Sequence, residues 1–540
     1  MSLMRQRCDR TTIQKFVVTA AQMRQIEERS FAAGMPVAAL MEKVGAQITQ
    51  RVLAIAQAYY SHRANDHYQW GILVGPGHNG GDALVVAREL HLRGQSVQVF
   101  CPFTQLKELT DQHARYCRHL GIPFVDRVTE LERCDVLIDG LFGFGLERAL
   151  TGEVAAAIAQ INQWQASTNR CIISIDLPSG LHTDTGEVLG TVVQASQVLC
   201  LGLWKQGLVQ EPTTKAHWQT ELLDIGLPLA DITTILGDTP QVQRLTTQWI
   251  AEHLPLPRPI TTHKYAVGHL LLICGSEQYA GGAILTALGA RASGVGMLTI
   301  AIPSSLKPIL TAQIPEALVI GCPETADGAI AELPAALDFA KFQAIACGPG
   351  LTLAAQPIVE QVMASDRPLI LDADGLNALA QLGTETLRDR PAATILTPHL
   401  GEFRRLFPTL AEAMNCRITT VQAAAQACGA VVLLKGARTA ISAPDGTTLI
   451  STESSPGLAR GGSGDVLTGL IGGLLAQLVQ SEPTHAPLHA AAIASWLHAQ
   501  AGIASAQRYS QLGVDPITVS QQVPQVLRQL QSQFTWLHST

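Results

Sequence analysis

The stretch Arg460-Gly461-Gly462-Ser463-Gly464-Asp465-Val466-Leu467-Thr468-Gly469 decides how the second half of this chain is interpreted. Three glycines stand ahead of an acid, and an apolar segment of helical period continues through Leu470 and Leu474. Glycine lets the backbone approach a ligand, and the first turn of a helix offers unpaired N–H groups to an anion. Asp465 can then accept a proton from a substrate hydroxyl while the amides hold a phosphate. The pattern indicates nucleotide-dependent chemistry on an alcohol, or a glycine-rich turn in which Asp465 only caps a helix.

The composition around this stretch is typical of a multidomain α/β enzyme. A chain of 540 residues predicts more than one domain. Hydrophobic residues make up 47% and charged residues 15%, which is not the balance of a disordered chain. The net charge of −7 argues against binding to nucleic acid or to an acidic membrane surface. No uncharged apolar run reaches roughly 18 residues, so no segment is expected to span a membrane.

The first residues and the cysteines bear on localisation. Residues 1–15 carry Arg5, Arg7, Arg10 and Lys15 but no apolar core, which predicts a disordered basic start and no secretory signal; an organelle transit peptide is the lesser alternative. The 11 cysteines are scattered, and most lie inside apolar strand-like runs. They are interpreted as reduced core residues of a cytoplasmic protein.

The first block of the chain, up to about residue 240, alternates strand-like and helical segments. A helical stretch is expected over 19–58. Strand-like runs follow at 71–74, 97–100, 136–138, 172–175 and 198–201. Helical segments separate several of these runs, so a largely parallel sheet covered on both faces is predicted.

The second block repeats this alternation after a proline-punctuated connector over 229–262, in which one short helix is expected. Strand-like runs stand at 270–274, 298–302, 317–320, 344–347, 369–371, 394–396 and 431–434. Pro444-Asp445-Gly446 predicts a hairpin turn, and an amphipathic final helix is expected over 524–534 with Pro524 in its first turn. We therefore predict two domains, 1–240 and 241–540.

A second glycine loop, Gly75-Pro76-Gly77-His78-Asn79-Gly80-Gly81-Asp82, lies between a strand-like run and a helix in the first block. It satisfies the G-x-G-x-x-G pattern of dinucleotide sites, which also require an acid about 20 residues further on. The next strand-like run ends instead in Cys101-Pro102-Phe103. The missing acid argues against ordinary nicotinamide binding for hydride transfer.

Two carboxylates of the first block follow strand-like runs, where α/β sheets place function. They are Asp139 and Asp176. The oxygens of Asn79, Asp139 and Ser179 are hard ligands that suit a monovalent cation, and Asp176 can exchange a proton with a ligand bound near it. Taken singly, each of these residues is better explained as a hydrogen-bonding loop residue, and it is their convergence at strand ends that favours a site.

The motifs of this block together resemble the YjeF N-terminal domain, which implies a Rossmann-like three-layer fold. They are Ala21–Arg24, Leu40–Glu42, His78–Asp82, Asp139–Gly145 and Asp176–Gly180. The resemblance implies an epimerase for hydrated NADH or NADPH (NADHX or NADPHX) with potassium at its site. Two positions depart from the family pattern, because His78 replaces an asparagine and Ala83 a glycine.

By matched motif, the resemblance implies Asp176 as the catalytic residue and Asn79, Asp139 and Ser179 as the potassium ligands. The implied substrate contacts are Asp176 together with His78, Asn79, Gly80, Gly81, Asp82, Gly143, Phe144, Gly145, Leu146, Glu147, Arg148 and Ala149.

The second block resembles the ADP-dependent NAD(P)HX dehydratase domain of the ribokinase-like fold over nearly all of residues 263–500. The motifs that carry the resemblance, in order, are His263-Lys264, Gly275–Ala283, Gly348–Gly350, Asp372–Asn377, Thr397–Glu402, Leu434–Thr439 and Gly462–Gly469. The implied substrate contacts are Ala283, Gly350, His399 and Asp465, and the implied ADP or AMP contacts are Lys435, Gly436, Ala437, Arg438, Thr439 and Gly464.

Elementary chemistry is consistent with these roles. Lys435 and Arg438 flank a glycine after a strand-like run, which suits binding of phosphates; a solvated hairpin edge is the alternative. His399 is either a substrate contact or a structural loop histidine, and Asp372 and Asp374 are expected to brace the loop beneath the site. The helix dipole should keep Asp465 ionised, so its position is expected to matter more than a raised pKa.

The resemblance implies a two-domain repair enzyme that acts on NADHX and NADPHX. The first domain would interconvert the R and S hydrates, and the second would dehydrate the S form with ADP and magnesium. ADP would phosphorylate the C6 hydroxyl, and loss of phosphate would restore the ring. Relatives of both domains self-associate, which implies a homo-oligomer. The alternatives are a small-molecule kinase, because Gly-x-Gly-Asp before a helix also serves kinases, and a scaffolding role for the first domain.

Overall fold

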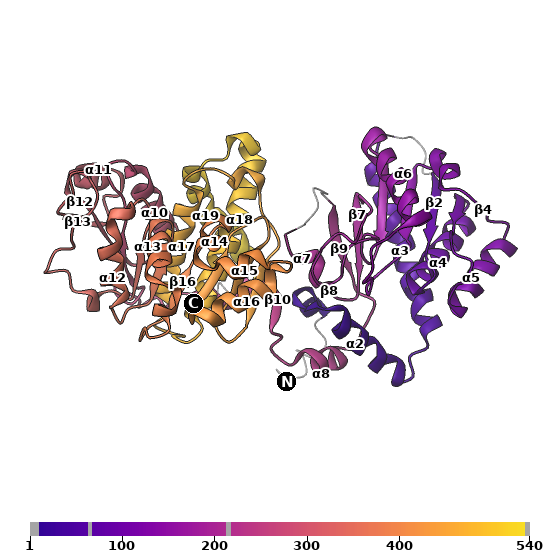
Figure 1. The fold of residues 1–540 in the computed structure, drawn as a ribbon, viewed down its shortest axis with the longest axis horizontal. Helices are drawn as coiled ribbons and strands as arrows, with labels where there is room; N and C mark the ends of the chain where they lie inside the picture. Colours follow the sequence, from indigo (N-terminus) through magenta and orange to yellow (C-terminus); the bar gives the residue numbers. More distant parts are fainter. Residues whose placement is uncertain (1–9, 63–66, 212–217, 535–540) are drawn as a thin grey trace. The chain divides into compact units, whose positions relative to one another are not determined.

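The chain divides into two compact units, Met1–Pro240 and Gln241–Thr540, in a computed structural model that describes residues 10–62, 67–211 and 218–534 (Figure 1). Arg5 and Arg7 lie outside the described residues. Residues Arg10–Lys15 form a 3-10 helix, and the Arg10 guanidinium binds the Asp224 carboxylate. This part of the expected disordered start is therefore folded, because Arg10 has a carboxylate partner far along the chain.

The first unit is built on a seven-stranded parallel sheet of order β4-β3-β2-β5-β6-β7-β9. All five predicted strand-like runs are confirmed as strands. The strands are β2 (Gln69–Val74), β3 (Ser96–Phe100), β4 (Phe124–Val125), β5 (Val136–Gly140), β6 (Cys171–Ile175), β7 (Gln197–Leu201) and β9 (Gln219–Leu223). Every residue of β5 and β6 is buried and most of them are apolar, as expected for strands covered by helices on both faces of the sheet.

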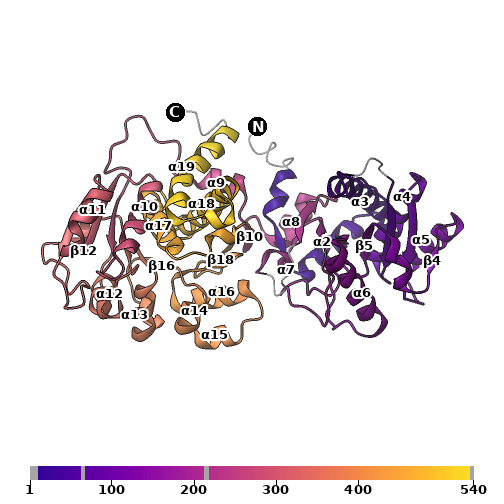
Figure 2. The same cartoon turned by 90° about the horizontal axis from the view of Figure 1, so that it is seen from above.

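Helices cover both faces of this sheet, which confirms the three-layer prediction. Figure 2 shows α3 and α4 on one side and α6 on the other. The helices are α2 (Ala20–Ala32), α3 (Val37–Tyr59), α4 (His78–Leu92), α5 (Glu108–His119), α6 (Gly152–Thr168), α7 (Gln206–Val209) and α8 (Leu229–Leu236). The single helix expected over 19–58 is wrong. It breaks between α2 and α3, because Gly34 has φ +102° and Pro36 precedes α3 as its N-cap.

A separate two-stranded sheet lies beside the main sheet and positions a lysine. β1 (Val17–Val18) pairs in parallel with β8 (Trp204–Lys205), so that Val18 stands opposite Lys205. Because β8 follows β7 directly, this pairing holds the Lys205 side chain close to the carboxyl ends of the main strands.

The second unit is built on a ten-stranded sheet of order β10-β19-β18-β17-β16-β15-β14-β11-β12-β13. Only β18 runs antiparallel to its neighbours, β17 and β19, and the predicted hairpin turn at Pro444–Gly446 connects β18 to β19. The strands are β10 (Val242–Arg244), β11 (His269–Ile273), β12 (Met297–Pro303), β13 (Leu318–Cys322), β14 (Ala344–Cys347), β15 (Leu369–Leu371), β16 (Thr394–Leu396), β17 (Val431–Leu434), β18 (Thr439–Ser442) and β19 (Thr448–Ser451). The sequence did not predict β10, which lies in the proline-rich connector.

Two sets of helices sandwich this sheet (Figure 2). The first is α9 (Thr247–His253), α10 (Ala280–Ala292), α17 (Ser463–Leu478), α18 (Ala486–Tyr509) and α19 (Pro516–Gln533). The second is α12 (Gln356–Met363), α13 (Asp374–Leu382), α14 (Leu400–Leu406), α15 (Pro408–Glu412) and α16 (Arg417–Cys428), and α11 (Lys307–Gln313) precedes β13. The α/β class with two parallel-sheet units is confirmed.

The last helix differs from its prediction. It begins at Pro516, where the Asp515 side chain accepts hydrogen bonds from the amides of Ile517 and Thr518. Pro524 therefore lies inside the helix, not in its first turn. The prediction failed because it took the proline as a start signal and overlooked the capping aspartate. Among the helices that the structure describes, none has both the length and the hydropathy of a bilayer crossing.

Candidate active sites

The first candidate site is a cavity of about 530 Å³ at the carboxyl ends of the strands of the first unit. Its walls come from α2, α3, the start of α4, the loop after β5 and the residues after β6 and β7. Eight of the residues predicted for this site line it: His78, Asn79, Asp82, Gly143, Phe144, Gly145, Leu146 and Asp176. The topology therefore gathers loops from four separate strand ends around one space.

Asp176 is held in a fixed position at the floor of this cavity. Its Oδ1 atom lies 2.5 Å from Lys205 Nζ and accepts from the amide of Leu201 at 3.2 Å, while its Oδ2 accepts from the amide of Phe144 at 3.0 Å. The Asp176 backbone has φ +68°, a left-handed conformation that is costly for a residue with a side chain. Lys205 is fully buried and also donates to the carbonyl of Leu201. Asp176 and Lys205 thus form a buried, immobilised ion pair.

Asp139 and Ser179 are close together, as predicted for the cation site. Asp139 accepts four hydrogen bonds: from Ser179 Oγ at 2.6 Å, Ser179 N at 2.9 Å, Ser174 Oγ at 2.8 Å and Leu141 N at 3.2 Å. Burial raises the pKa of Asp139, and these hydrogen bonds oppose that rise. The donor atoms have the hardness that a monovalent cation prefers, but a cation at Asp139 must replace at least one of these hydrogen bonds.

Asn79, the third predicted cation ligand, stands in the first turn of α4 and faces Gly143. A Cβ atom at Gly143 would lie 3.3 Å from Asn79 Oδ1 and 3.1 Å from Asp176 Oδ2. The buried Asn79 Nδ2 atom has no hydrogen-bond partner among the described residues. An amide with an unsatisfied donor beside a cavity is available to a ligand.

Five predicted substrate contacts do not line the cavity. Gly80 and Gly81 are buried beneath it: a Cβ at Gly80 would lie 2.0 Å from the carbonyl oxygen of Gly75, and one at Gly81 would lie 2.7 Å from Met41. These two glycines thus allow α4 to pack closely. Glu147, Arg148 and Ala149 are exposed on the loop beyond Leu146. Their substrate contacts remain predictions.

Sequence reasoning assigned no role to two residues of this cavity, Lys205 and Glu27. Lys205 lies in a mostly apolar stretch of sequence, and no local sequence pattern predicts that its side chain is buried. Glu27 lies on α2, far from the glycine loop in sequence, and burial raises its pKa to about 7, while Lys205 opposes the rise. Burial and the charges of Asp176 and Glu27 also raise the pKa of Asp82 well above its usual value. The sequence indicated which side of α2 faces the cavity only through the helical spacing of Met23, Glu27 and Phe31.

The second candidate site surrounds the start of α17, at the carboxyl ends of β11, β15 and β17. Asp465 is the third residue of α17, and a Cβ at Gly282 would lie 3.4 Å from its Oδ2. Burial raises the pKa of Asp465 to about 6, the charge of Asp372 adds to the rise, and Lys435 opposes it. We expected position to matter more than a raised pKa for Asp465; the pKa is nevertheless raised, because desolvation and a neighbouring carboxylate outweigh the dipole, although a value of about 6 still allows Asp465 to be ionised at neutral pH.

Asp372 connects three elements beneath Asp465. Its Oδ1 accepts from Lys435 Nζ at 2.8 Å, and its Oδ2 accepts from Thr468 Oγ1 at 2.5 Å. The next residue, Ala373, has φ +48°. Asp374 accepts from the amide of Thr352 at 2.9 Å, so it braces a loop as expected. Asp372 does more than brace: it holds Lys435, the lysine predicted to bind phosphate, against α17.

Lys435 and Gly464 lie side by side, as the resemblance implies. A Cβ at Gly464 would lie 3.5 Å from Lys435 Nζ. The side chain of Lys435 is 20% exposed, so its ammonium keeps access to a ligand. Gly436 and Ala437 form the exposed turn that leads to Arg438 and to Thr439, which opens β18. These residues present backbone amides and two side chains at one edge of the site.

His399 has a structural role that one of the two interpretations expected. Its Nδ1 caps α14 by accepting from the amides of Gly401 at 2.9 Å and Glu402 at 3.3 Å. Its ring is 56% exposed, so Nε2 remains accessible. Glu402 is buried, burial raises its pKa, and its Oε2 lies 3.9 Å from Lys435 Nζ. The sequence analysis assigned Glu402 no role, although it occupies the predicted motif.

Ala283 and Gly350 line the approach from α10. Ala283 is fully buried, and its side chain packs against Gly275, where a Cβ would lie 2.9 Å away. Gly350 has φ +67°, and a Cβ there would lie 2.8 Å from Tyr279 Cβ. Any contact of these two residues with a ligand is thus made through the backbone.

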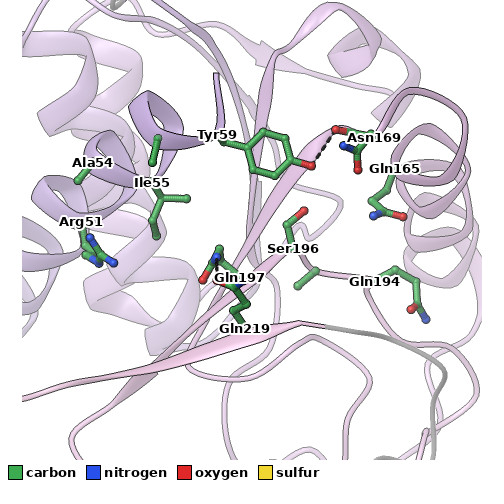
Figure 3. Close-up of a pocket in the computed structure, with 12 residues that line it drawn as sticks. Arg51, Ala54, Ile55, Tyr59, Gln165, Asn169, Gln194, Ser196, Gln197 and Gln219 are labelled. Atoms are coloured by element: carbon green, nitrogen blue, oxygen red, sulfur yellow. Dashed lines mark hydrogen bonds between the residues drawn. The ribbon is translucent and has the colours of Figure 1, made fainter. Parts of the chain in front are cut away.

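A further cavity of about 670 Å³ in the first unit lies at the opposite end of the strands (Figure 3). Gln197 and Gln219 open β7 and β9 there and share a hydrogen bond of 2.8 Å, and Tyr59 Oη donates to the carbonyl of Asn169 at 2.9 Å. Neutral amides and hydroxyls dominate its walls, and none of the predicted site residues lines it.

Comparisons with known families match both units. Residues 270–525 match the model described as NAD(P)H-hydrate dehydratase, and residues 37–207 match the model described as YjeF-related protein N-terminus. The chain is 52% identical over 500 residues to the bifunctional NAD(P)H-hydrate repair enzyme Nnr of a Synechocystis species, covering 92% of each chain. It is 51% identical over 501 residues to the enzyme of the same name from Thermosynechococcus vestitus, covering 93% of this chain and 95% of the relative.

Among solved structures, an ADP/ATP-dependent NAD(P)H-hydrate dehydratase from Bacillus subtilis, co-crystallized with ATP and Mg²⁺, is 32% identical with a TM-score of 0.46, over 53% of this chain and 97% of that one. The two family models and the full-length relatives lead to one conclusion: the chain belongs to the family of bifunctional NAD(P)H-hydrate repair enzymes.

Proposed function

We propose that this protein repairs hydrated NADH and NADPH with two activities on one chain. The first unit epimerises R and S NAD(P)HX, and the second uses ADP to dehydrate the S epimer to NAD(P)H, releasing AMP and phosphate. The observation that carries the proposal is the position of Asp465, which stands in the first turn of α17, faces Gly282 and has a pKa of about 6.

The dehydration begins with Asp465 as the base. Asp465 accepts the proton of the C6 hydroxyl, whose oxygen attacks the β-phosphorus of ADP; the bond from the β-phosphorus to the α-phosphate oxygen breaks, and AMP leaves. A carboxylate with a pKa near neutrality is a better proton acceptor than an ordinary aspartate. The amides around Gly462–Gly464 and the Lys435 ammonium stabilise the phosphoryl charge. Loss of a proton from C5 and of phosphate from C6 then restores the ring double bond.

Magnesium is proposed to enter with ADP. No group of three or more His, Cys, Asp or Glu side chains within residues 10–62, 67–211 and 218–534 is arranged to hold a metal by itself. Magnesium commonly keeps several waters and is held by one or two carboxylates together with phosphates, which suits this site. Asp372 and Glu402 are the carboxylates beside Lys435 that such an ion would approach.

Potassium is proposed to bind at Asn79, Asp139 and Ser179 in the first unit. The supporting observations are the hard oxygens of Asp139 and Ser179, together with the Asn79 Oδ1 atom, which faces Gly143 in the same cavity. We expect potassium, and not lithium, to raise the melting temperature of the wild type, and we expect Asp139→Asn to lose this rise. An equal shift with both ions would contradict a built site.

The decisive experiment mixes the purified protein with ADP, magnesium and S-NADHX and follows the return of the NADH absorbance band, with AMP measured by chromatography. The separate epimerisation of pure R-NADHX is followed without ADP. Unchanged NADHX together with phosphorylation of a sugar or hydroxymethyl-pyrimidine would favour a kinase. Failure to epimerise, with dehydration intact, would favour a scaffolding role for the first unit.

We further propose that the protein works in the cytoplasm as a homo-oligomer. The ten cysteines of the described residues are all free, and nine of them are buried, which suits a reducing compartment. Self-association is the state that the resemblance implies, and light scattering coupled to size exclusion tests it: a mass of 57.6 kDa at micromolar concentration would contradict it.

A further inference from the structure

The cavity of the first unit holds more acids than its buried cation can balance. Lys205 is paired with Asp176, whereas Glu27 and Asp82 also line the cavity and make no side-chain hydrogen bond or ion pair with the described residues. The charged and titratable groups that line the cavity are Arg24, Glu27, Glu28, His78, Asp82, Lys107, Asp176 and Lys205. A second buried carboxylate beside an occupied ion pair is stabilised in its protonated form.

Glu27 and Asp176 differ in how they are held. Asp176 is fixed by two backbone amides and by Lys205 at the ends of the strands. Glu27 comes from α2, the helix that lies next to the small β1–β8 sheet, and its half-buried carboxyl is free to contact a ligand. The two acids thus enter one cavity from different elements, and only Asp176 is held by hydrogen bonds from the described residues.

From this geometry we propose that Glu27 is a second catalytic residue of the epimerase and exchanges its proton with the C6 hydroxyl on the ring face opposite Asp176. The proposal deepens the epimerase function proposed above and rests on it. Inversion at C6 requires one group to protonate the departing oxygen and another to deprotonate the water that arrives on the other face.

Protons and electrons are conserved in this step. The Glu27 carboxyl gives its proton to the C6 hydroxyl oxygen, the C6–O bond breaks, and its electron pair leaves with water. The N1 lone pair forms the N1=C6 double bond. A water then bonds to C6 from the opposite face, the π electrons return to N1, and Asp176 takes the proton of that water. The proton returns from Asp176 to Glu27 through water, and the reverse epimerisation uses the same groups in exchanged roles.

Glu27 suits this role better than Asp82. The pair Glu27 and Asp176 must hold one proton between them in either direction, so a carboxyl that changes state near neutral pH is required. Burial raises the pKa of Glu27 to about 7. Burial, with the charges of Asp176 and Glu27 adding to it, raises the pKa of Asp82 well above its usual value, which favours the protonated form over a form that alternates between two states.

The test follows epimerisation of R-NADHX without ADP, in wild type, Glu27→Gln, Glu27→Asp and the control Glu132→Gln, an exposed glutamate on η2 (Val128–Arg133). We expect Glu27→Gln to lower kcat roughly 100-fold with KM little changed, because general acid–base groups contribute about that much. Glu27→Asp should recover part of the rate, and Glu132→Gln should match wild type.

Two readouts separate catalysis from a structural role. The wild-type rate should fall about tenfold per pH unit above pH ~7, and Glu27→Gln should lose this limb. In ¹⁸O-labelled water each epimerisation should place one label in the C6 hydroxyl. Retention of the unlabelled oxygen, a pH limb that survives in Glu27→Gln, or a kcat equal to wild type would each overturn the proposal.

The same samples also distinguish this inference from the function on which it rests. A wild-type protein that never epimerises R-NADHX removes the proposed epimerase function itself. A wild type that epimerises, beside an equally active Glu27→Gln variant, removes only the role of Glu27. Dehydration of pure S-NADHX with ADP should be unchanged in every variant, which shows that the second unit is intact, and partial activity of Glu27→Asp shows that a substitution at this position leaves the first unit folded.

Discussion

The candidate sites of the two units contain the same set of charged groups, but different elements of the fold supply them. Each has an aspartate paired to a lysine at the carboxyl edge of a parallel sheet: Asp176 with Lys205 in the first, and Asp372 with Lys435 in the second. Each also has a second acid with a raised pKa, Glu27 at about 7 and Asp465 at about 6. In each unit the lysine is already paired with the first aspartate. It therefore offsets the desolvation of the second acid only in part, and the pKa of that acid rises.

The difference between the units is where the second acid comes from. Asp465 belongs to the glycine-rich helix start that is expected to hold phosphate, so one motif supplies both the proton acceptor and the anion site. Glu27 belongs to a helix outside the strand–helix alternation of its sheet. The comparison teaches that a unit can take its second acid from a helix that lies outside the strand–helix alternation of its sheet.

The largest expected effect comes from removing the acid in the second unit. Asp465→Asn should lower the rate of S-NADHX dehydration by roughly 10³-fold, because no other group in that position can accept the hydroxyl proton. Epimerisation by the same protein should be unchanged. NADH absorbance measures the first activity and chromatography of the epimers the second. The exposed Asp389→Asn is the control. Loss of both activities in Asp465→Asn would contradict the independence of the two units.

The next effect concerns the ion pairs themselves. Lys205→Met leaves the buried Asp176 without its cation, which should lower the free energy of unfolding of the first unit by about 3 kcal/mol. Lys435→Met should cost less, because the Lys435 side chain is 20% exposed whereas Lys205 is fully buried, so solvent already weakens the attraction between Lys435 and Asp372. Urea denaturation monitored by fluorescence measures both. Equal losses would show that burial does not distinguish the two pairs.

The pH dependence of the two activities should have opposite limbs. Dehydration needs Asp465 ionised, so its rate should fall about tenfold per unit as pH drops below ~6. Epimerisation needs one proton on Glu27 and Asp176 together, so its rate should fall as pH rises above ~7. Rates measured from pH 5 to 9 on one preparation give both profiles. If both activities fell on the same side of neutral pH, the assignment of an ionised Asp465 to one site and a protonated Glu27 to the other would be contradicted.

The smallest effects are expected from the glycines that face the acids. Gly143→Ala would place Cβ 3.1 Å from Asp176 Oδ2, which is too close without a shift, and should raise the KM of epimerisation roughly threefold. Gly282→Ala would place Cβ 3.4 Å from Asp465 Oδ2, an ordinary contact, and should change dehydration by less than about twofold. Steady-state kinetics of both variants measures how tightly each acid is enclosed. A larger effect of Gly282→Ala than of Gly143→Ala would contradict these packing distances.

Local pattern was sufficient for much of the fold. Apolar runs such as 136–138 and 344–347 became β5 and β14 because a buried strand needs only apolar side chains on both faces. Pattern failed where the deciding partner is remote or was overlooked. β10 has three residues and exists because it pairs with β19, about two hundred positions away. α19 begins at Pro516 because Asp515 caps it, a signal that lay outside the segment chosen for the helix.

The same division holds for the sites. By itself, the amino-acid sequence determined the two glycine loops, the acids at strand ends and the family, because each of these is written in consecutive residues. Only the tertiary structure decided that Lys205 is buried against Asp176, that Asp372 holds Lys435 and that Glu27 faces the cavity. Charge stabilisation and desolvation depend on distance in space, and residues 29 to 149 positions apart in the chain become neighbours only when the sheets and helices have packed.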